Sequence, residues 1–173
     1  MFAMFTDSHC HLTFPELRQQ IADIRQRMQA ASVSRAMCIC TTLEEFDNVH
    51  ALAMQHPDFW CSVGVHPDNE GVAEASVDGL LALARRPKVL AIGETGLDYY
   101  RLNGRTIADM QWQRDRFRTH IEAAQRAQKP LVVHTRAASE DTLAVLKEAG
   151  EGSPGAHRAG GVFHCFTESL DVA

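Results

Sequence analysis

The chain has 173 residues, of which 45% are apolar, 23% charged and 7% aromatic, values that exclude a disordered chain and a disulfide-stapled mini-protein. The length predicts one domain, residues 1–173, with a single core. Seventeen Lys and Arg against 22 Asp and Glu give a net charge of −5, so bulk attraction to nucleic acid or an anionic membrane does not organise the surface.

Short apolar runs alternate along the chain with longer stretches of helical periodicity. The short runs are mostly bounded by Pro, Gly or polar residues, which predicts strands, and the longer stretches predict one-sided amphipathic helices. We expect Ser139 to cap the last helix. The predicted strands are Met4–Thr6, Arg35–Cys40, Phe59–Val65, Lys88–Glu94, Leu131–His134 and Gly161–His164, and the predicted helices are 17–31, 43–55, 76–86, 110–124 and 139–149.

The order of these elements predicts an α/β fold with a parallel sheet. Continuous apolar strands separated by helices occur in a doubly wound sheet or in a (β/α) barrel of the TIM type. One βα unit takes about 30 residues and a closed eight-fold barrel takes about 250. The chain therefore accommodates about six of eight units, and if the fold is a barrel we expect an incomplete one.

Two further features bear on where the protein works. No apolar stretch approaches the roughly 18 to 20 residues of a membrane span, and Asp7 and His9 stand where a signal peptide needs an apolar run, so we expect a cytoplasmic protein that contacts no membrane. The five cysteines are odd in number, contain no C-x-x-C pattern and mostly lie in apolar runs. We interpret them as reduced core thiols.

Polar side chains gather at the carboxyl ends of the predicted strands. Five of the nine histidines lie there, together with one glutamate. In parallel α/β folds this edge of the sheet is where ligands bind and catalytic groups meet. The residues are His9 and His11 after the first strand, His66 after the third, Glu94 after the fourth, His134 after the fifth and His164 after the sixth.

This combination predicts a metal site. His9 and His11 are two residues apart, so in an extended chain both imidazoles point to the same side. A carboxylate at the tip of a buried strand, such as Glu94, can bridge two cations, and the mixed N/O set suits Zn, Mn or Fe, or Mg with added waters. One histidine at a strand end is ordinarily structural, but their conjunction on successive strands favours metal binding.

Several other polar residues have weaker signals. Arg101, Arg105 and Arg136 follow the fourth and fifth strands at the same edge, where guanidinium groups could hold a phosphate. Tyr99 and Tyr100 could stack on unpaired bases or pack within their loop. We read Arg114, Arg116 and Arg118 as solvated helix positions, and we assign no role to His50, His56, His120 and His157.

Five motifs in this order resemble the TatD-like metal-dependent hydrolases, a TIM-barrel branch of the amidohydrolase superfamily. The resemblance extends from the first residues to the last. The motifs are Thr6–Leu12 (TDSHCHL), Val63–Pro67 (VGVHP), Ile92–Tyr100 (IGETGLDYY), Val133–Arg136 (VHTR) and Phe163–Thr167 (FHCFT).

The resemblance implies a deoxyribonuclease that uses two divalent ions, Mg, Mn or Zn, and trims single-stranded DNA or a DNA 3′ end. Glu94 and His66 would be its catalytic side chains. By the same resemblance His66 would line the substrate pocket and Asp7 would orient a metal ligand. From their position at this edge of the sheet we expect Arg136 and Arg101 to contact the substrate as well. The implied ligands are His9, His11 and Glu94 for the first ion and Glu94, His134 and His164 for the second.

The sequence departs from the family pattern in one respect. The family has a further ligand, an aspartate after the last barrel strand, and we expect the chain to lack it together with strands 7 and 8. We therefore expect open sheet edges and an isolated chain that is poorly stable, prone to aggregate or completed by a partner. Two alternatives stay open: a hydrolase of another ester or amide bond, such as aminoacyl-tRNA, and a truncated remnant without turnover.

Overall fold

In the computed structural model of the chain, the structure describes residues 4–151 and 158–172. His157 and most of the loop before the sixth strand lie outside the described residues. Six parallel strands form one sheet in the order β1-β2-β3-β4-β5-β6, each beside the next strand in the sequence. They are β1 (Phe5–Cys10), β2 (Val33–Cys38), β3 (Phe59–Val63), β4 (Val89–Asp98), β5 (Leu131–Arg136) and β6 (Gly161–Phe163).

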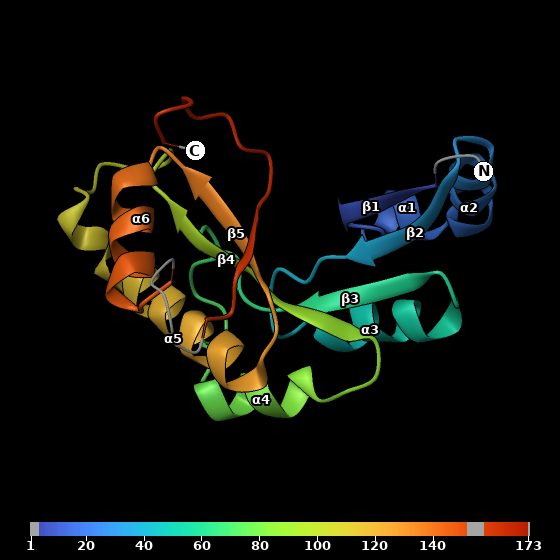
Figure 1. Cartoon of the computed structure of the whole chain (residues 1–173), viewed down its shortest axis with the longest axis horizontal. Coiled ribbons are helices and arrows are strands. Elements are labelled where there is room, and N and C mark those ends of the chain that lie inside the picture. The colour runs from blue at the N-terminus through green and yellow to red at the C-terminus, as the bar shows by residue number, and fades with distance from the viewer. Residues whose placement is uncertain (1–3, 152–157, 173) are drawn as a thin grey trace.

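Helices follow the strands and lie around the outside of the curled sheet, as Figure 1 shows. The sequential strand order is that of a barrel and excludes a doubly wound sheet, in which the order reverses at a switch point. The predicted incomplete (β/α) barrel is therefore confirmed. The helices are α1 (Pro15–Arg18), α2 (Ile21–Ala30), α3 (Phe46–Gln55), α4 (Val77–Ala84), α5 (Gln111–Ala127) and α6 (Ser139–Glu148), with a 3₁₀ turn, Ala108–Met110, before α5.

The main core lies between the outer face of the sheet and the helices. Its largest fully buried side chains include Phe46 from α3, Phe59 from β3 and Phe117 from α5. A second, small cluster of Ile39, Ala91 and Val132 forms separately from this core. Burial of a large apolar side chain contributes roughly 1.5–3 kcal/mol, so the outer layer supplies most of the hydrophobic stability.

The strand boundaries correct one prediction that matters for the site. We expected the fourth strand to end at Glu94, but β4 continues to Asp98, and its last residues pair with β5 as far as Asp98 and Arg136. Gly96 permits this continuation, because a Cβ there would lie 2.0 Å from the carbonyl oxygen of His134 and its φ is +129°.

The helices differ from the predictions in two places. The expected helix over 17–31 is divided into α1 and α2, although Leu17, Ile21 and Met28 still pack against the core as their spacing predicts. Ser139 is the first residue of α6 and not its cap, which is Ala138 without a side-chain hydrogen bond. Helix ends are difficult to predict from sequence because several residue types occur there.

The sheet has two edges among the described residues. Strand β1 pairs with β2 alone and β6 with β5 alone. Phe5 on β1 and Val162 on β6 are more than two-fifths exposed, as is Leu90 on β4. Exposed apolar side chains beside unpaired strand edges favour association with another chain.

The structure tests two expectations, one about the cysteines and one about membrane-spanning helices. All five cysteines are free; Cys38, Cys40 and Cys61 are buried as expected, Cys10 is partly buried, and Cys165 is exposed, which corrects its assignment to the core. Across the described residues, no helix combines the length and the apolar character needed to cross a bilayer.

Helix α5 carries polar side chains on its buried face, which corrects the reading of its arginines. Arg116 is only 4% exposed, stacks its guanidinium on Trp112 at 4.8 Å and pairs with Glu74. Arg114 is also mostly covered, since it donates hydrogen bonds to the Tyr99 hydroxyl and to Asp141. Apolar periodicity placed the helix correctly but could not reveal that its inward face is partly polar.

His120 on the same face is a buried neutral imidazole. Its Nε2 accepts a hydrogen bond from the Val65 N–H at 3.0 Å, and its Nδ1 lies 2.8 Å from the Arg116 carbonyl oxygen. Complete burial lowers the pKa of His120 from 6.5 to about 4. The unfolded chain therefore binds the extra proton between pH 6.5 and pH 4, so this contribution to stability is complete above pH 6.5 and is lost as the pH falls.

This depressed pKa gives a stability prediction. Between pH 7.5 and pH 4.5 the unmodified chain should lose about 2–3 kcal/mol more unfolding free energy than His120→Gln, which keeps an acceptor for Val65 but does not titrate. Urea unfolding of both proteins at the two pH values measures the difference. Equal losses in the two proteins would show that His120 does not produce the pH dependence.

Candidate metal centre

The site is built on the carboxyl edge of the sheet around one buried carboxylate. Glu94 in β4 is 2% exposed, and its main-chain N–H donates to the carbonyl oxygen of Cys40, which holds that part of β4 in place. Side chains from four other places along the chain converge on it. They are His9 and His11 at the end of β1, His66 after β3, His134 in β5 and His164 after β6.

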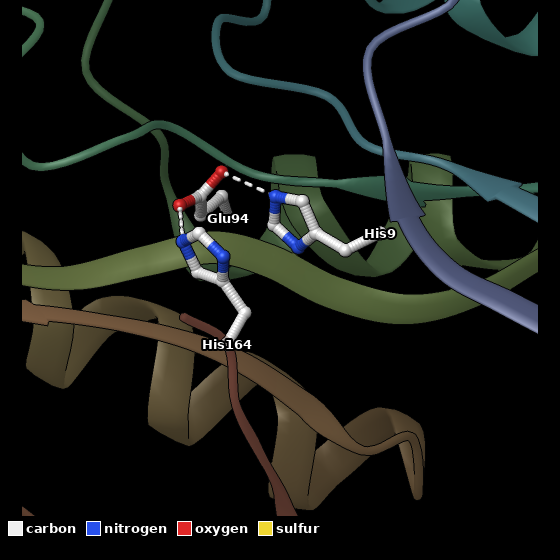
Figure 2. A group of neighbouring side chains, drawn as sticks. All are labelled: His9, Glu94 and His164. Atoms are coloured by element: carbon white, nitrogen blue, oxygen red, sulfur yellow. Dashed lines mark ion pairs between the residues drawn. The ribbon is translucent and has the colours of Figure 1, made fainter. Parts of the chain in front are cut away.

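Each oxygen of Glu94 faces a pair of histidines, and Oε1 also lies 3.6 Å from His66 Nε2. Oε2 lies 3.2 Å from His9 Nε2 and 3.9 Å from His11 Nε2. Oε1 lies 3.2 Å from His134 Nδ1 and 2.6 Å from His164 Nε2. Figure 2 shows one member of each pair, His9 on one oxygen and His164 on the other.

The spacing within each pair fits metal ligation. His9 Nε2 lies 3.2 Å from His11 Nε2, and His134 Nδ1 lies 3.3 Å from His164 Nε2. Nitrogens bound at about 2.0–2.1 Å around a tetrahedral ion lie about 3.3 Å apart. Nitrogen and oxygen donors together suit Zn, Mn or Fe. The residues present therefore fit two divalent ions that share Glu94.

The charges of the site depend on these contacts. Burial alone would raise the pKa of Glu94, but hydrogen bonds from His134, His164 and His9 outweigh it and hold that pKa well below its usual range. Burial alone would lower the pKa of His134, but the hydrogen bonds to Asp98 and Glu94 raise it from 6.5 to about 9. Before an ion binds, the site therefore holds a carboxylate and a protonated imidazole at neutral pH.

His66 has a different character from the other four histidines. Its Nδ1 accepts the N–H of Asp68 at 3.1 Å, which places the ring proton on Nε2. That Nε2 lies 3.6 Å from Glu94 Oε1. Burial lowers the pKa of His66 to about 4, so the ring is neutral at pH 7. His66 is thus a neutral hydrogen-bond donor aimed into the site, and this tautomer does not offer Nε2 as a ligand.

Asp98 is a residue of this site that the sequence reasoning missed. It is 4% exposed, and its Oδ2 lies 3.1 Å from His134 Nε2, while Oδ1 accepts the N–H of Tyr100 at 2.9 Å. The Nε2–H of His134 is therefore donated to Asp98, and Nδ1 is left for the metal site. The signal was present in the sequence, because residues four apart on one strand share a face and Asp98 follows Glu94 by four.

The remaining predicted contacts lie around this centre. The Asp7 carboxylate accepts the main-chain N–H of His9 at 3.1 Å and does not contact its ring. Among the described residues, Nδ1 of His9 and Nδ1 of His11 have no hydrogen-bond partner. Arg101 is exposed after β4, and Arg105 is engaged with Glu70 at 2.8 Å.

The two tyrosines have separate environments. The ring of Tyr99 is 6% exposed and its hydroxyl donates to Asp141 at 2.7 Å, so packing, and not base stacking, describes it. Tyr100 is 61% exposed, and the guanidinium of Arg136 stacks on its ring at 3.7 Å from the centroid. An exposed aromatic ring and a stacked guanidinium offer a contact surface for a base and a phosphate.

A cavity of about 400 Å³ opens onto the centre, a size that admits one nucleotide-sized ligand group. Its wall combines the candidate ligands with polar groups from the loops after β2 and β3. The lining residues are His11, Phe14, Thr41, His66, Asp68, Asn69, Glu94, His134 and His164.

Comparison with known proteins identifies the family to which the chain is similar. The family model described as "TatD related DNase" matches residues 6–173. The "Uncharacterized metal-dependent hydrolase YcfH" of Escherichia coli K12 is 35% identical over 170 residues, which are 96% of this chain and 60% of that protein. The "3'-5' ssDNA/RNA exonuclease TatD" of Salmonella typhimurium LT2 is 34% identical over 164 residues, 94% of this chain and 60% of that protein.

The fold is also similar to that of a solved structure. The crystal structure of YJJV, a TatD homolog from Escherichia coli K12, superposes with a TM-score of 0.84 at 30% identity, covering 98% of this chain and 62% of that one. The chain thus spans about 60% of the length of the curated relatives named above.

Proposed function

Because the chain belongs to the TatD related DNase family, we propose that it forms the metal centre of a divalent-metal-dependent nuclease. The observation that carries the proposal is the division of Glu94, with one oxygen toward His9 and His11 and the other toward His134 and His164. His9 and His11 would hold one ion and His134 and His164 the other, and Glu94 would offer one oxygen to each.

Two bound ions would supply Lewis acidity to a phosphodiester and to the attacking water. The chain's own groups supply the rest. Asp98 holds His134 in one tautomer, so that Nδ1 points to Glu94. Neutral His66 offers its Nε2–H to an oxygen of the substrate in the cavity, and Glu94 stays ionised across the physiological pH range because its pKa is depressed.

We propose a single-stranded nucleic acid as the substrate, read from its 3′ end. The Salmonella relative named as a 3'-5' ssDNA/RNA exonuclease supports this class. In this chain the exposed ring of Tyr100 supports it as well, because unpaired bases are free to stack on an aromatic side chain. The metal centre alone would serve another ester or amide bond equally, so the substrate assignment rests on that relative and, in this chain, on Tyr100 and Arg136.

The test is digestion of an oligonucleotide labelled at its 5′ end. With Mn²⁺ we expect stepwise shortening from the 3′ end of single strands, slower action on duplexes and no action in chelator. Release of no nucleotide, together with metal-dependent cleavage of a simple ester substrate, would contradict the nuclease proposal and favour the other hydrolase class.

Arg136 gives a prediction about substrate binding. Arg136→Ala should raise KM for a single-stranded oligonucleotide by roughly 5- to 10-fold, and should reduce the slope of log affinity against log salt by about 0.7, the value for one phosphate contact on a single strand. The matched control is Arg126→Ala on the outer side of α5, whose side chain pairs with Asp78 and Glu122. A salt slope equal to that of the unmodified chain would show that Arg136 holds no phosphate.

A further inference from the structure

The carboxyl end of β4 extends beyond the neighbouring strand β3. Strand β3 pairs with β4 only as far as Val63 and Ile92, whereas β5 accompanies β4 to Asp98. The last residues of β4 therefore have a strand partner on the β5 side alone. Main-chain groups on the other side need partners from elsewhere, since a buried N–H or carbonyl left unpaired destabilises the fold.

Gln113 on α5 supplies both partners at Asp98. Its Oε1 accepts the Asp98 N–H at 2.9 Å, and its Nε2 donates to the Asp98 carbonyl oxygen at 3.1 Å. The side chain is completely buried. Both ends of one amide are thus used on the main chain of one residue, and this two-point contact fixes the position of Asp98 and the direction of its side chain.

The residue fixed in this way is the one whose carboxylate contacts His134. From Gln113 the contacts run through the main chain of Asp98 to its Oδ2, then to His134 Nε2, and through the imidazole to Nδ1 beside Glu94. We infer that Gln113 is a positioning residue for the metal centre, acting through Asp98 on the orientation of His134. This inference rests on the proposed metal centre and adds a residue 15 positions after Asp98.

Gln125 on the same helix provides a matched comparison. Its Nε2 donates to the carbonyl oxygen of Ala149 at 2.8 Å and contacts Glu151, at the end of α6 and away from the metal ligands. Replacing either glutamine with methionine keeps the side-chain length. At Gln113 it removes two hydrogen bonds to the main chain of Asp98, and at Gln125 it removes one to the main chain of Ala149 and one to the side chain of Glu151. Only the change at Gln113 should alter the orientation of His134.

The experiment is calorimetric titration of the 173-residue chain with Mn²⁺, together with a thermal melt. Gln113→Met should weaken Mn²⁺ binding by about 10-fold or more, the range seen when partners of metal ligands are removed, whereas Gln125→Met should change it less than about twofold. Both should lower Tm. In an Asp98→Asn background, Gln113→Met should cause no further loss of affinity.

A second variant covers the case in which Gln113→Met does not fold. Gln113→Asn keeps an uncharged amide but is one methylene shorter, so it cannot hold both main-chain groups of Asp98, and it should also weaken Mn²⁺ binding. Unchanged affinity in a folded Gln113 variant, beside an unmodified chain that binds Mn²⁺, would contradict this inference alone. An unmodified chain that binds no Mn²⁺ would contradict both the inference and the proposed metal centre.

Discussion

Replacing Glu94 with glutamine is expected to remove both proposed ions and to lower the proposed nuclease activity on the order of 1,000-fold or more. Lewis-acid stabilisation is worth several kcal/mol, and each 1.4 kcal/mol changes a rate about tenfold. The amide has nearly the same shape as the carboxylate, but it has no negative charge. It also has only one oxygen, whereas the two proposed ions need one oxygen each. Activity at saturating Mn²⁺ and bound metal per chain are the two measurements.

The control for this change is Glu148→Gln. Glu148 pairs with Arg118 at 2.8 Å on the outer face and is more than half exposed, so its substitution should leave metal content and activity unchanged. A Glu94→Gln protein that retained both ions, with activity within tenfold of the unmodified chain, would show that the shared carboxylate is not the centre of the site.

The second large effect is expected at Asp98. Asp98→Asn should weaken Mn²⁺ binding by about 10- to 100-fold, as is usual for a carboxylate that orients a histidine ligand. The pKa of His134 should also fall, because the hydrogen bond to Asp98 is the largest influence that raises it. Calorimetry at pH 8.5, where fewer His134 rings carry the extra proton, gives the cleanest comparison of affinities.

The same residue predicts a pH dependence of metal uptake. An ion must displace the proton of His134, whose pKa is about 9 in the metal-free chain, so Mn²⁺ affinity should rise from pH 6.5 toward pH 9. In Asp98→Asn the rise should end at a lower pH. Affinity curves of the two proteins that plateau at the same pH would show that Asp98 does not set the protonation of His134.

The fold followed from the sequence because its pattern repeats. Apolar runs such as Leu131–Val133 alternate with helical stretches, and the parallel order then brings the strand ends to one edge. This alone predicted that His134, His164 and Glu94 would meet, and the structure places them within hydrogen-bonding distance. Element boundaries were less accurate, and the end of β4 was wrong by four residues.

The polar supports of the site could not be predicted in the same way. Gln113, Arg116 and His120 lie on the inward face of α5, where periodicity leads one to expect apolar side chains. Each is buried because it bonds main-chain groups at or just after the ends of β3 and β4, such as the carbonyl oxygen of His66 for Arg116. Such partners are distant in sequence, so only the tertiary structure identifies them.

Metal stoichiometry tests the central claim most directly. Elemental analysis of the purified, size-fractionated chain after loading with Mn²⁺ or Zn²⁺ should find two ions per chain, and none in Glu94→Gln, because each oxygen of Glu94 faces one histidine pair. A chain that retains no ion after loading, or a Glu94→Gln variant that retains as many as the unmodified chain, would contradict a metal centre shared through Glu94.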